Sequence, residues 1–268
     1  GHECSDSPRR LNEGADMPDA MRGDARTTGE SEFRAVQRTL ESTYSPPAIA
    51  DARARQDAVL LERFKGKQYR FADIGCGNGY HAVLFAGSSE LYHGFEISPD
   101  MAVRAQDRWE RAGLTNAHVF VGDVAEADLP LAFYDVAMCL YFTPGNLRDK
   151  SDDLAMYTDA YLDRNPYFVR VMSRFIRALR RGGSLYLTVY RDTPETEAAQ
   201  FDFYEKTGQH PVTPRGGRFV ATAEGFWSAR WTEMSVLSNL AACGVSPGDV
   251  TFTELNAIAW LVEAKPSA

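Results

Sequence analysis

Cysteine is scarce in this chain, and the few cysteines are not spaced as metal ligands. The 268 residues include four cysteines, at positions 4, 76, 139 and 243, and no Cys-x-x-Cys pair. Closely spaced cysteine pairs are the usual signature of structural zinc, so the sequence predicts no metal site of this kind. We expect reduced, buried thiols in a cytoplasmic protein, because disulfides are rare in the cytosol.

Long apolar runs and an excess of basic residues are also missing. No run approaches the roughly 18–20 apolar residues that span a membrane. The chain has 29 Lys and Arg against 37 Asp and Glu, which gives a net charge of −8. A non-specific nucleic-acid binder carries a basic face. We therefore predict no nucleic-acid partner, no membrane partner and a small-molecule substrate.

The most informative stretch is a glycine-rich turn that follows an apolar strand. Residues Phe71–Gly79 read Phe-Ala-Asp-Ile-Gly-Cys-Gly-Asn-Gly. Glycine permits a tight turn and a close approach of backbone to ligand. In doubly wound α/β sheets such a turn follows the first strand, where nucleotides bind. The dinucleotide fingerprint Gly-x-Gly-x-x-Gly would need a glycine where this chain has Tyr80, so a nicotinamide-dependent oxidoreductase is disfavoured.

Two further acidic residues follow the next two predicted strands. Leu91–Ile97 reads as a second strand whose end carries Glu96. A carboxylate about 20 residues after the glycine turn can accept hydrogen bonds from a ribose diol. Asp123 follows a third predicted strand, Ala117–Val121. Each of these acids therefore follows or ends a predicted strand.

In this order the features resemble the class I S-adenosylmethionine-dependent methyltransferases, over residues 67–265. The resemblance implies an α/β fold: a doubly wound, mostly parallel seven-stranded sheet with an antiparallel last strand. It implies S-adenosyl-L-methionine as cofactor, Glu96 on the ribose hydroxyls and Asp123 on the adenine amino group. The cofactor-binding residues that it implies are Asp73, Gly75, Cys76, Gly77, Gly79, Glu96, Ile97, Asp123, Val124 and Leu140.

The remaining core elements are expected from apolar patterning and from their boundary residues. A helix opens at Asn165-Pro166 and stops at Gly182-Gly183, because glycine commonly ends helices. A second helix covers Trp231–Cys243. Further strands are predicted at residues 134–140, 184–190, 218–227 (as the sixth strand) and 250–263.

The chain divides into a tail, a helical lid and the cofactor-binding domain. Residues 1–30 are polar and without period, so we expect a flexible tail. Residues 31–66 are expected to form two helices, broken at Pro46-Pro47, as a lid over the cofactor. Tyr44, at this break, either faces the cofactor or packs as an ordinary turn residue. The domain is expected over residues 67–268, with insertions near 143–165 and 191–217.

Methyl transfer requires positioning more than a strong catalytic motif. The family's amide- and nucleobase-methylating branches carry Asn/Asp-Pro-Pro-Tyr/Phe after the fourth strand. This chain has Leu-Tyr-Phe-Thr-Pro-Gly-Asn at residues 140–146, which argues against those acceptors. Tyr141, Phe142 and Asn146 are therefore candidates for the acceptor site. The alternative is that the two aromatic residues belong to the core and Asn146 caps a turn.

The sequence also offers candidates for a general base and for an apolar wall of the acceptor site. His210 lies in a loop from which it could reach a substrate, and its alternative is a solvated structural role. Arg191 and Tyr190, after the fifth strand, could border the pocket. Candidates for an aromatic wall are Phe201, Phe203, Tyr204, Phe226, Trp227 and Trp231.

The sequence favours methyl transfer to a small acceptor, an amino acid or a natural-product intermediate. A second hypothesis makes S-adenosylmethionine itself the substrate. It would cyclise to an azetidine or cyclopropane amino acid with release of methylthioadenosine, or donate its aminocarboxypropyl group. A third hypothesis, a non-catalytic binding module, is opposed by the intact glycines and acids. A homodimer is possible in each case.

Overall fold

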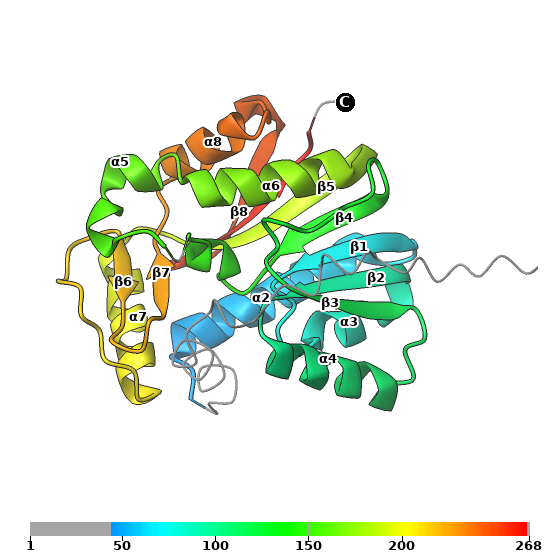
Figure 1. The fold of residues 1–268 in the computed structure, drawn as a ribbon, viewed down its shortest axis with the longest axis horizontal. Coiled ribbons are helices and arrows are strands. Elements are labelled where there is room, and N and C mark those ends of the chain that lie inside the picture. Colours follow the sequence, from blue (N-terminus) through cyan, green and yellow to red (C-terminus); the bar gives the residue numbers. More distant parts are fainter. Residues whose placement is uncertain (1–43, 150, 267–268) are drawn as a thin grey trace, which may run out of the picture.

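A seven-stranded sheet forms the centre of the molecule (Figure 1). The computed structural model describes residues 44–149 and 151–266. Four pairs of neighbouring strands in this sheet are parallel, and the two pairs at one edge are antiparallel. The predicted doubly wound sheet with an antiparallel last strand is confirmed. In spatial order the strands are β3 (Ala117–Val121), β2 (Ser89–Glu96), β1 (Tyr69–Ile74), β4 (Tyr134–Cys139), β5 (Leu179–Tyr190), β9 (Ala259–Ala264) and β8 (Val250–Asn256).

Helices cover both faces of this sheet (Figure 1). Because successive strand residues point to opposite faces, each strand supplies two cores. Phe71 and Val136 join one apolar cluster, and Ala72 and Ala137 join the other. One face carries α2 (Pro47–Phe64), α3 (Tyr80–Leu84) and α4 (Pro99–Arg111), and the other carries α6 (Pro166–Ala178) and α8 (Glu233–Ala242).

The start of α6 is fixed by its capping residue. The Asn165 side chain accepts hydrogen bonds from the backbone N–H groups of Tyr167 and Phe168, and Pro166 takes the first helical position. Both features are favourable at a helix N-terminus. The helix ends earlier than the glycines suggest, because Leu179 is already extended and pairs with Tyr134 of β4.

A separate layer lies beyond one end of the sheet. It contains α5 (Asp159–Leu162), α7 (Pro194–Lys206) and a hairpin of β6 (Phe219–Ala221) and β7 (Trp227–Ala229) (Figure 1). The prediction that residues 218–227 form the sixth strand of the main sheet is wrong. A turn at Gly225, with φ of 88°, folds this segment onto β7 instead. The main sheet takes β8 in that place.

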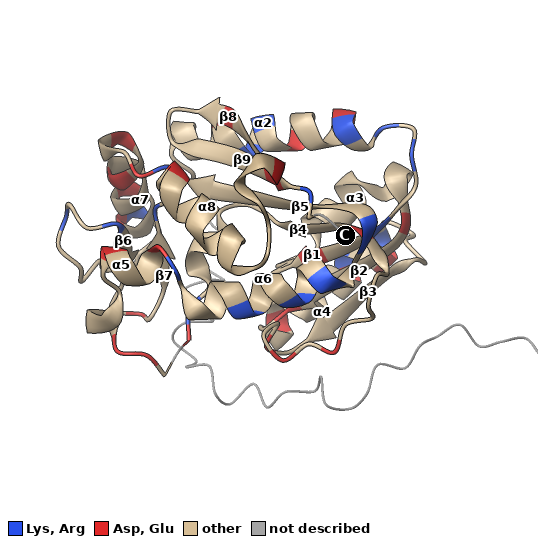
Figure 2. Ribbon diagram, turned by 90° about the horizontal axis from the view of Figure 1, so that it is seen from above, with Lys and Arg blue, Asp and Glu red and all other residues tan. Residues whose placement is uncertain are grey.

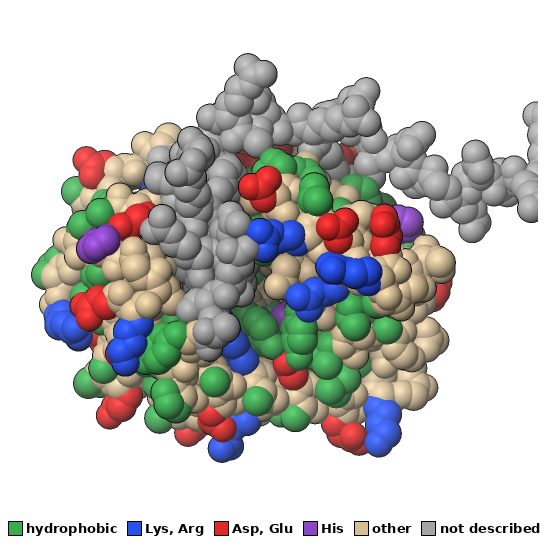
Figure 3. All heavy atoms as spheres, turned by 90° about the horizontal axis from the view of Figure 1, so that it is seen from below, with side chains coloured by type: hydrophobic (Ala, Val, Ile, Leu, Met, Phe, Trp, Pro, Cys, Tyr) green, Lys and Arg blue, Asp and Glu red, His purple; other side chains and the backbone are tan. Residues whose placement is uncertain are grey.

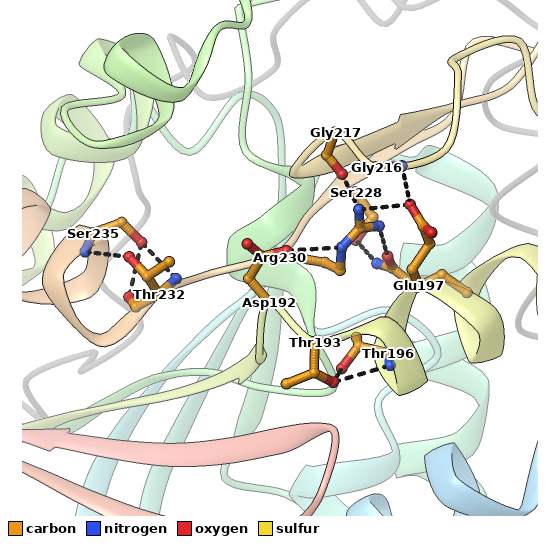
Figure 4. A network of polar contacts seen from close by, with 11 residues as sticks. Asp192, Thr193, Thr196, Glu197, Gly216, Gly217, Ser228, Arg230, Thr232 and Ser235 are labelled. Atoms are coloured by element: carbon orange, nitrogen blue, oxygen red, sulfur yellow. Dashed lines mark hydrogen bonds and ion pairs between the residues drawn. The ribbon is translucent and has the colours of Figure 1, made fainter.

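A buried arginine ties this layer together (Figure 4). The Arg230 side chain is 2% exposed and donates to Asp192, Glu197 and Gln200. A further guanidinium N–H is bonded to the Gly217 carbonyl. Because charged donors are costly to bury unpaired, this complete set of partners fixes α7 against the hairpin.

The described residues carry charges of both signs. Acidic residues gather on α7 and basic residues on α6 (Figure 2). On the face seen from below, basic and acidic side chains are interspersed among the described residues (Figure 3). Within the described ranges, no helix has the length and apolar character needed to cross a membrane. Nor do three His, Cys, Asp or Glu side chains of those residues come together as metal ligands would.

The lid and domain boundaries stay predictions. The expected helix at 31–43 and the tail at 1–30 lie outside the described residues. The second expected helix is present as α2, and Ile49, Ala52, Leu60 and Phe64 on it are buried in the core. This half of the expected lid is therefore a packed layer on the sheet.

Candidate functional site

A cavity of about 490 Å³ opens at the carboxyl ends of β1, β2, β4 and β5. Small-molecule sites commonly fall in the range of about 300–1,000 Å³ and at this edge of doubly wound sheets. Predicted residues that line it are Asp73, Gly75, Cys76, Gly77, Glu96, Ile97, Val124, Leu140, Tyr141, Phe142 and Asn146. Predicted residues that do not line it are Gly79, Asp123, Tyr44 and His210.

The glycine turn after β1 needs its glycines for conformation. Gly75, Gly77 and Gly79 have φ of 74°, 54° and 74°, in the left-handed region that side chains disfavour. The backbone N–H groups of Gly75 and Cys76 donate to the Phe95 carbonyl at 2.8 and 3.1 Å. The turn is thereby fixed to the end of β2.

Two buried carboxylates stand beside this turn. Glu96 is 7% exposed and accepts from the N–H groups of Gly77 (2.8 Å) and Ser98 (2.9 Å). Asp73 is 1% exposed and accepts from the Tyr92 hydroxyl at 2.5 Å. Burial raises the pKa of both carboxyls, although these hydrogen bonds oppose the rise. This end of the cavity therefore offers acceptors to ligand hydroxyl or amino groups.

Asp123 is not among the residues that line the cavity. Its Oδ1 accepts from the Ala125 N–H at 2.8 Å and from the Tyr167 hydroxyl. Val124 and Tyr167 line the cavity in its place. Asp123 thus supports Tyr167 of α6 at the cavity wall, and its contact with the adenine stays a prediction. No spacing in the sequence links Tyr167 to this loop.

The turn after β4 has an unusual backbone. Tyr141 and Phe142 are consecutive aromatic residues with φ of 50° and 69°, a conformation that costs about 1–3 kcal/mol per residue. Gln56 of α2 accepts the Tyr141 N–H at 3.2 Å. The Phe142 ring stacks on Tyr190 with centroids 3.6 Å apart and planes 2° from parallel. These contacts hold both aromatic side chains at the cavity.

A buried carboxylate on α2 supports the same turn. Asp57 is 8% exposed and accepts from the Tyr141 hydroxyl (2.6 Å), the Tyr80 hydroxyl (3.1 Å) and Gln56 Nε2 (2.9 Å). His81 Nε2 lies 3.6 Å from its Oδ1. Burial would raise the pKa of Asp57, but the contacts with His81 and Tyr141 lower it overall. In the sequence, Gln56 and Asp57 are two of many polar residues of α2, and nothing local distinguishes them from solvent-facing ones.

Asn146 connects the segment after β4 to the hairpin at the wall of the cavity. Its Nδ2 donates to the Trp227 carbonyl at 2.6 Å, and the Trp227 indole donates to the Asn146 carbonyl at 3.1 Å. Of the predicted aromatic wall, Phe203, Tyr204, Phe226 and Trp227 line the cavity, and Phe201 and Trp231 do not.

Three other candidates lie elsewhere. The Tyr44 hydroxyl is bonded to Asp202 and accepts from Lys206 at 2.9 Å, so this tyrosine packs on α7 instead of facing the cavity. Arg191 pairs with Glu254 at 3.0 Å on the surface. The side chain of His210 is 78% exposed and pairs with Glu224 at 2.6 Å. These contacts agree with the alternative roles, a turn residue for Tyr44 and a structural residue for His210, and the roles at a cofactor or substrate stay predictions.

Replacing His210 with alanine is expected to change stability slightly and ligand binding by less than about twofold, as for other exposed pairs. Burial would raise the pKa of Glu224, but hydrogen bonds from His210 outweigh it and lower the pKa to about 2. The pairing thus stabilises the fold above pH 4.5 and is lost as the pH falls toward about 2. Calorimetry with S-adenosylhomocysteine and thermal unfolding against pH check this, and a tenfold loss of affinity would contradict it.

Comparisons with known proteins agree with this architecture. Residues 71–183 match the family described as methyltransferase domain. A protein-L-isoaspartate O-methyltransferase of Methanoculleus marisnigri is 35% identical over 88 residues, 32% of this chain and 40% of that protein. One of Pyrococcus abyssi is 34% identical over 82 residues, 30% of this chain and 38% of that protein. The chain thus spans about two fifths of the length of these curated relatives.

Solved structures share the fold over most of the chain. The 1,6-didemethyltoxoflavin-N1-methyltransferase of Burkholderia thailandensis has a TM-score of 0.55 at 15% identity, covering 90% of this chain and 92% of that one. An amino pentose methyltransferase of Micromonospora echinaspora has a TM-score of 0.53 at 18% identity, covering 87% and 96%. The chain shares the fold of these methyltransferases, and residues 71–183 are similar to the methyltransferase domain family.

Proposed function

We propose that this chain binds S-adenosylmethionine in the cavity and transfers its methyl group to a small-molecule acceptor. One observation carries the proposal. A single cavity joins the glycine turn and the buried carboxylates Asp73 and Glu96 to an aromatic chamber around Phe142 and Tyr190. A nucleoside cofactor and an acceptor need to meet in this way.

The residues present fit the cofactor. Glu96 faces the cavity with a carboxylate that can accept from ribose hydroxyls, and Asp73 can accept from the amino group of the methionine part. Ile97, Val124 and Tyr167 provide apolar and aromatic surface for the adenine. When bound, S-adenosylmethionine supplies a methyl group on a sulfonium, which a nucleophile can displace in line.

The chain's own residues position the reactants and supply aromatic side chains at the cavity. The rings of Phe142 and Tyr190 are 3% exposed each and stacked on each other, so they form a fixed part of the cavity wall. Aromatic faces attract cations by about 0.5–2 kcal/mol, which suits a sulfonium. The rigid turn at Tyr141 and Phe142 holds these faces in place, as in-line displacement requires.

A small acceptor is favoured by the size and walls of the chamber. Its aromatic side chains come from α7, the hairpin and the turn after β4, which together enclose it. Structural relatives named for didemethyltoxoflavin and an amino pentose act on small molecules. The isoaspartate enzymes match only 40% or less of their own length, outside which their acceptor specificity can lie.

Incubation with S-adenosylmethionine alone tests the reaction type. We expect intact S-adenosylmethionine, retained by the protein, and no methylthioadenosine above the non-enzymatic background in mass spectrometry. Release of S-adenosylhomocysteine should then require an added acceptor. Methylthioadenosine formed without an acceptor would support the alternative, cyclisation to an azetidine or cyclopropane amino acid. Aminocarboxypropyl transfer would release methylthioadenosine only when an acceptor is added. The control is Glu96→Ala, which should bind S-adenosylmethionine and S-adenosylhomocysteine only weakly.

A further inference from the structure

We propose that the acceptor chamber takes a planar, carboxylate-bearing molecule whose carboxylate is held by Arg53, with Arg148 as the second cation of the chamber. This inference rests on the proposed function, because it names the acceptor class of the same cavity. Three arginines line the cavity, at positions 53, 108 and 148. The proposal is carried by Arg53 and Arg148, which lie against the aromatic rings, and by the absence of a carboxylate partner for either among the described residues.

Arg53 projects from α2 among aromatic rings. Its guanidinium carbon lies 5.0 Å from the centroid of the Tyr141 ring and 5.9 Å from that of Phe203. Its Nε is inaccessible to solvent and has no hydrogen-bond partner in the part of the chain that the structure describes. A buried guanidinium N–H without an acceptor is costly, and a bound anion would offset that cost.

The natural partner of Arg53 is engaged elsewhere. Asp57 lies four residues later on the same helix, a spacing at which Asp and Arg commonly pair. Its carboxylate instead accepts from Tyr80, Tyr141 and Gln56. Arg53 has no ion pair with any carboxylate among residues 44–149 and 151–266. Its charge is therefore available to a ligand.

Two buried arginines that do not line the cavity are paired with carboxylates. Arg230 is 2% exposed and has two carboxylate partners and two further acceptors (Figure 4). Arg218, at 10% side-chain exposure, pairs with Asp163 at 2.8 Å. Where the fold buries an arginine for structure, it supplies carboxylates. The chamber does not, which points to a ligand.

Arg148 adds a second cation from the segment after β4. Its Nη2 donates to the Gly225 carbonyl at 3.1 Å, and its guanidinium carbon lies 6.0 Å from the centroid of the Trp227 ring. Its Nε is also buried without a partner among the described residues. The bond to the hairpin holds the group at the wall while leaving part of the guanidinium without an acceptor.

The charges of the cavity are therefore separated. The only acids among its described lining residues are Asp73 and Glu96, both beside the glycine turn. Arg53 and Arg148 contact the aromatic rings of the cavity, and a third lining arginine, Arg108, comes from α4 and interacts with Tyr80. A cationic or neutral acceptor would leave the guanidinium groups of Arg53 and Arg148 unpaired, whereas a carboxylate can accept two parallel N–H bonds from one of them. The surrounding aromatic faces suit a flat molecule.

Titration calorimetry of the full chain with matched probes tests this. We would use benzoate with benzamide and 4-hydroxybenzoate with 4-hydroxybenzamide, each with and without saturating S-adenosylhomocysteine. Each carboxylate should bind about tenfold or more tightly than its carboxamide, since a charged hydrogen-bonded pair is stronger than a neutral one. Arg53→Gln should remove the preference. Arg55→Gln should retain it, because Arg55 is an exposed residue of the same helix that pairs with Asp51.

Three outcomes would overturn the inference. Equal affinity for acid and amide, or no binding of any carboxylate, would leave the arginines without the proposed role. In the third outcome, Arg53→Gln weakens the binding of S-adenosylhomocysteine but not of methylthioadenosine, and the variant still binds each carboxylate more tightly than its carboxamide. Arg53 would then hold the cofactor's own carboxylate. Failure of the proposed function looks different: the unmodified chain would not bind S-adenosylhomocysteine, whatever its behaviour toward the carboxylates.

Discussion

Glu96→Ala should bind S-adenosylhomocysteine about 10- to 100-fold more weakly than the unmodified chain, because each lost charged hydrogen bond is worth about 1.5–3 kcal/mol. The carboxylate faces the cavity from the end of β2, and no other acidic side chain of β2 lines it. Glu96→Gln, which keeps one carbonyl oxygen as acceptor, should lose less. Calorimetry gives the dissociation constants directly.

The same strand provides the control for this experiment. Glu90 is a second glutamate of β2, half exposed and paired with Arg70 at 2.8 Å. Glu90→Ala should leave the affinity unchanged within about twofold, as expected for a surface pair. Circular dichroism should show that all three variants are folded. Unchanged affinity in folded Glu96→Ala would remove Glu96 from the proposed cofactor site.

Gly79→Ala should destabilise the fold by about 2–5 kcal/mol, from left-handed strain of about 1–2 kcal/mol and overpacking of about 1–3 kcal/mol. Gly79 has φ of 74°, and an added Cβ would lie 2.4 Å from Trp109 Nε1 and 2.9 Å from Ala105 Cβ. Trp109 is fully buried and donates to the Gly79 carbonyl at 2.8 Å, so it has no free space to move into. Cofactor affinity should fall as well, because the turn carries Gly77.

Gly113→Ala separates strain from overpacking. Gly113 has nearly the same φ, 71°, but nothing lies within 4 Å of an added Cβ. It should therefore lose only about 1–2 kcal/mol of the free energy of unfolding, with cofactor affinity unchanged. Urea denaturation of both variants measures the difference. Equal losses would mean that the contact with Trp109 is relieved at no cost and that the turn is more compliant than its packing indicates.

The cofactor half of the cavity was predictable because its signals are local. Glycines with a required backbone conformation and acids that end strands occupy fixed places in the sequence, and Asp73, Gly75, Gly77 and Glu96 all reach the cavity. The partner of Asp123 could not be predicted, since it is the Tyr167 hydroxyl, 44 residues away. That pairing is set by how α6 packs, which the local sequence does not encode.

The acceptor half was harder to predict because it is assembled from distant segments. Arg53 and Asp57 read as solvent-facing charges of a helix, and only packing on the sheet brings them against Tyr141. The partner of His210 was equally hidden, because its loop position does not indicate the Glu224 that pairs with it. The error over residues 218–227 came from an apolar segment that pairs locally through the turn at Gly225.

The contacts between α2 and the turn after β4 show that residues outside the matched methyltransferase segment help to form the cavity. The segment that matches the methyltransferase domain family begins at residue 71 and ends at 183. Gln56 and Asp57, which hold the Tyr141 backbone and hydroxyl, precede it, and Tyr190, on which Phe142 stacks, follows it. The matched segment alone would contain the strained turn without the side chains that maintain its shape. Grafting that segment between relatives should therefore transfer cofactor recognition but not acceptor choice, which belongs to the flanking sequence.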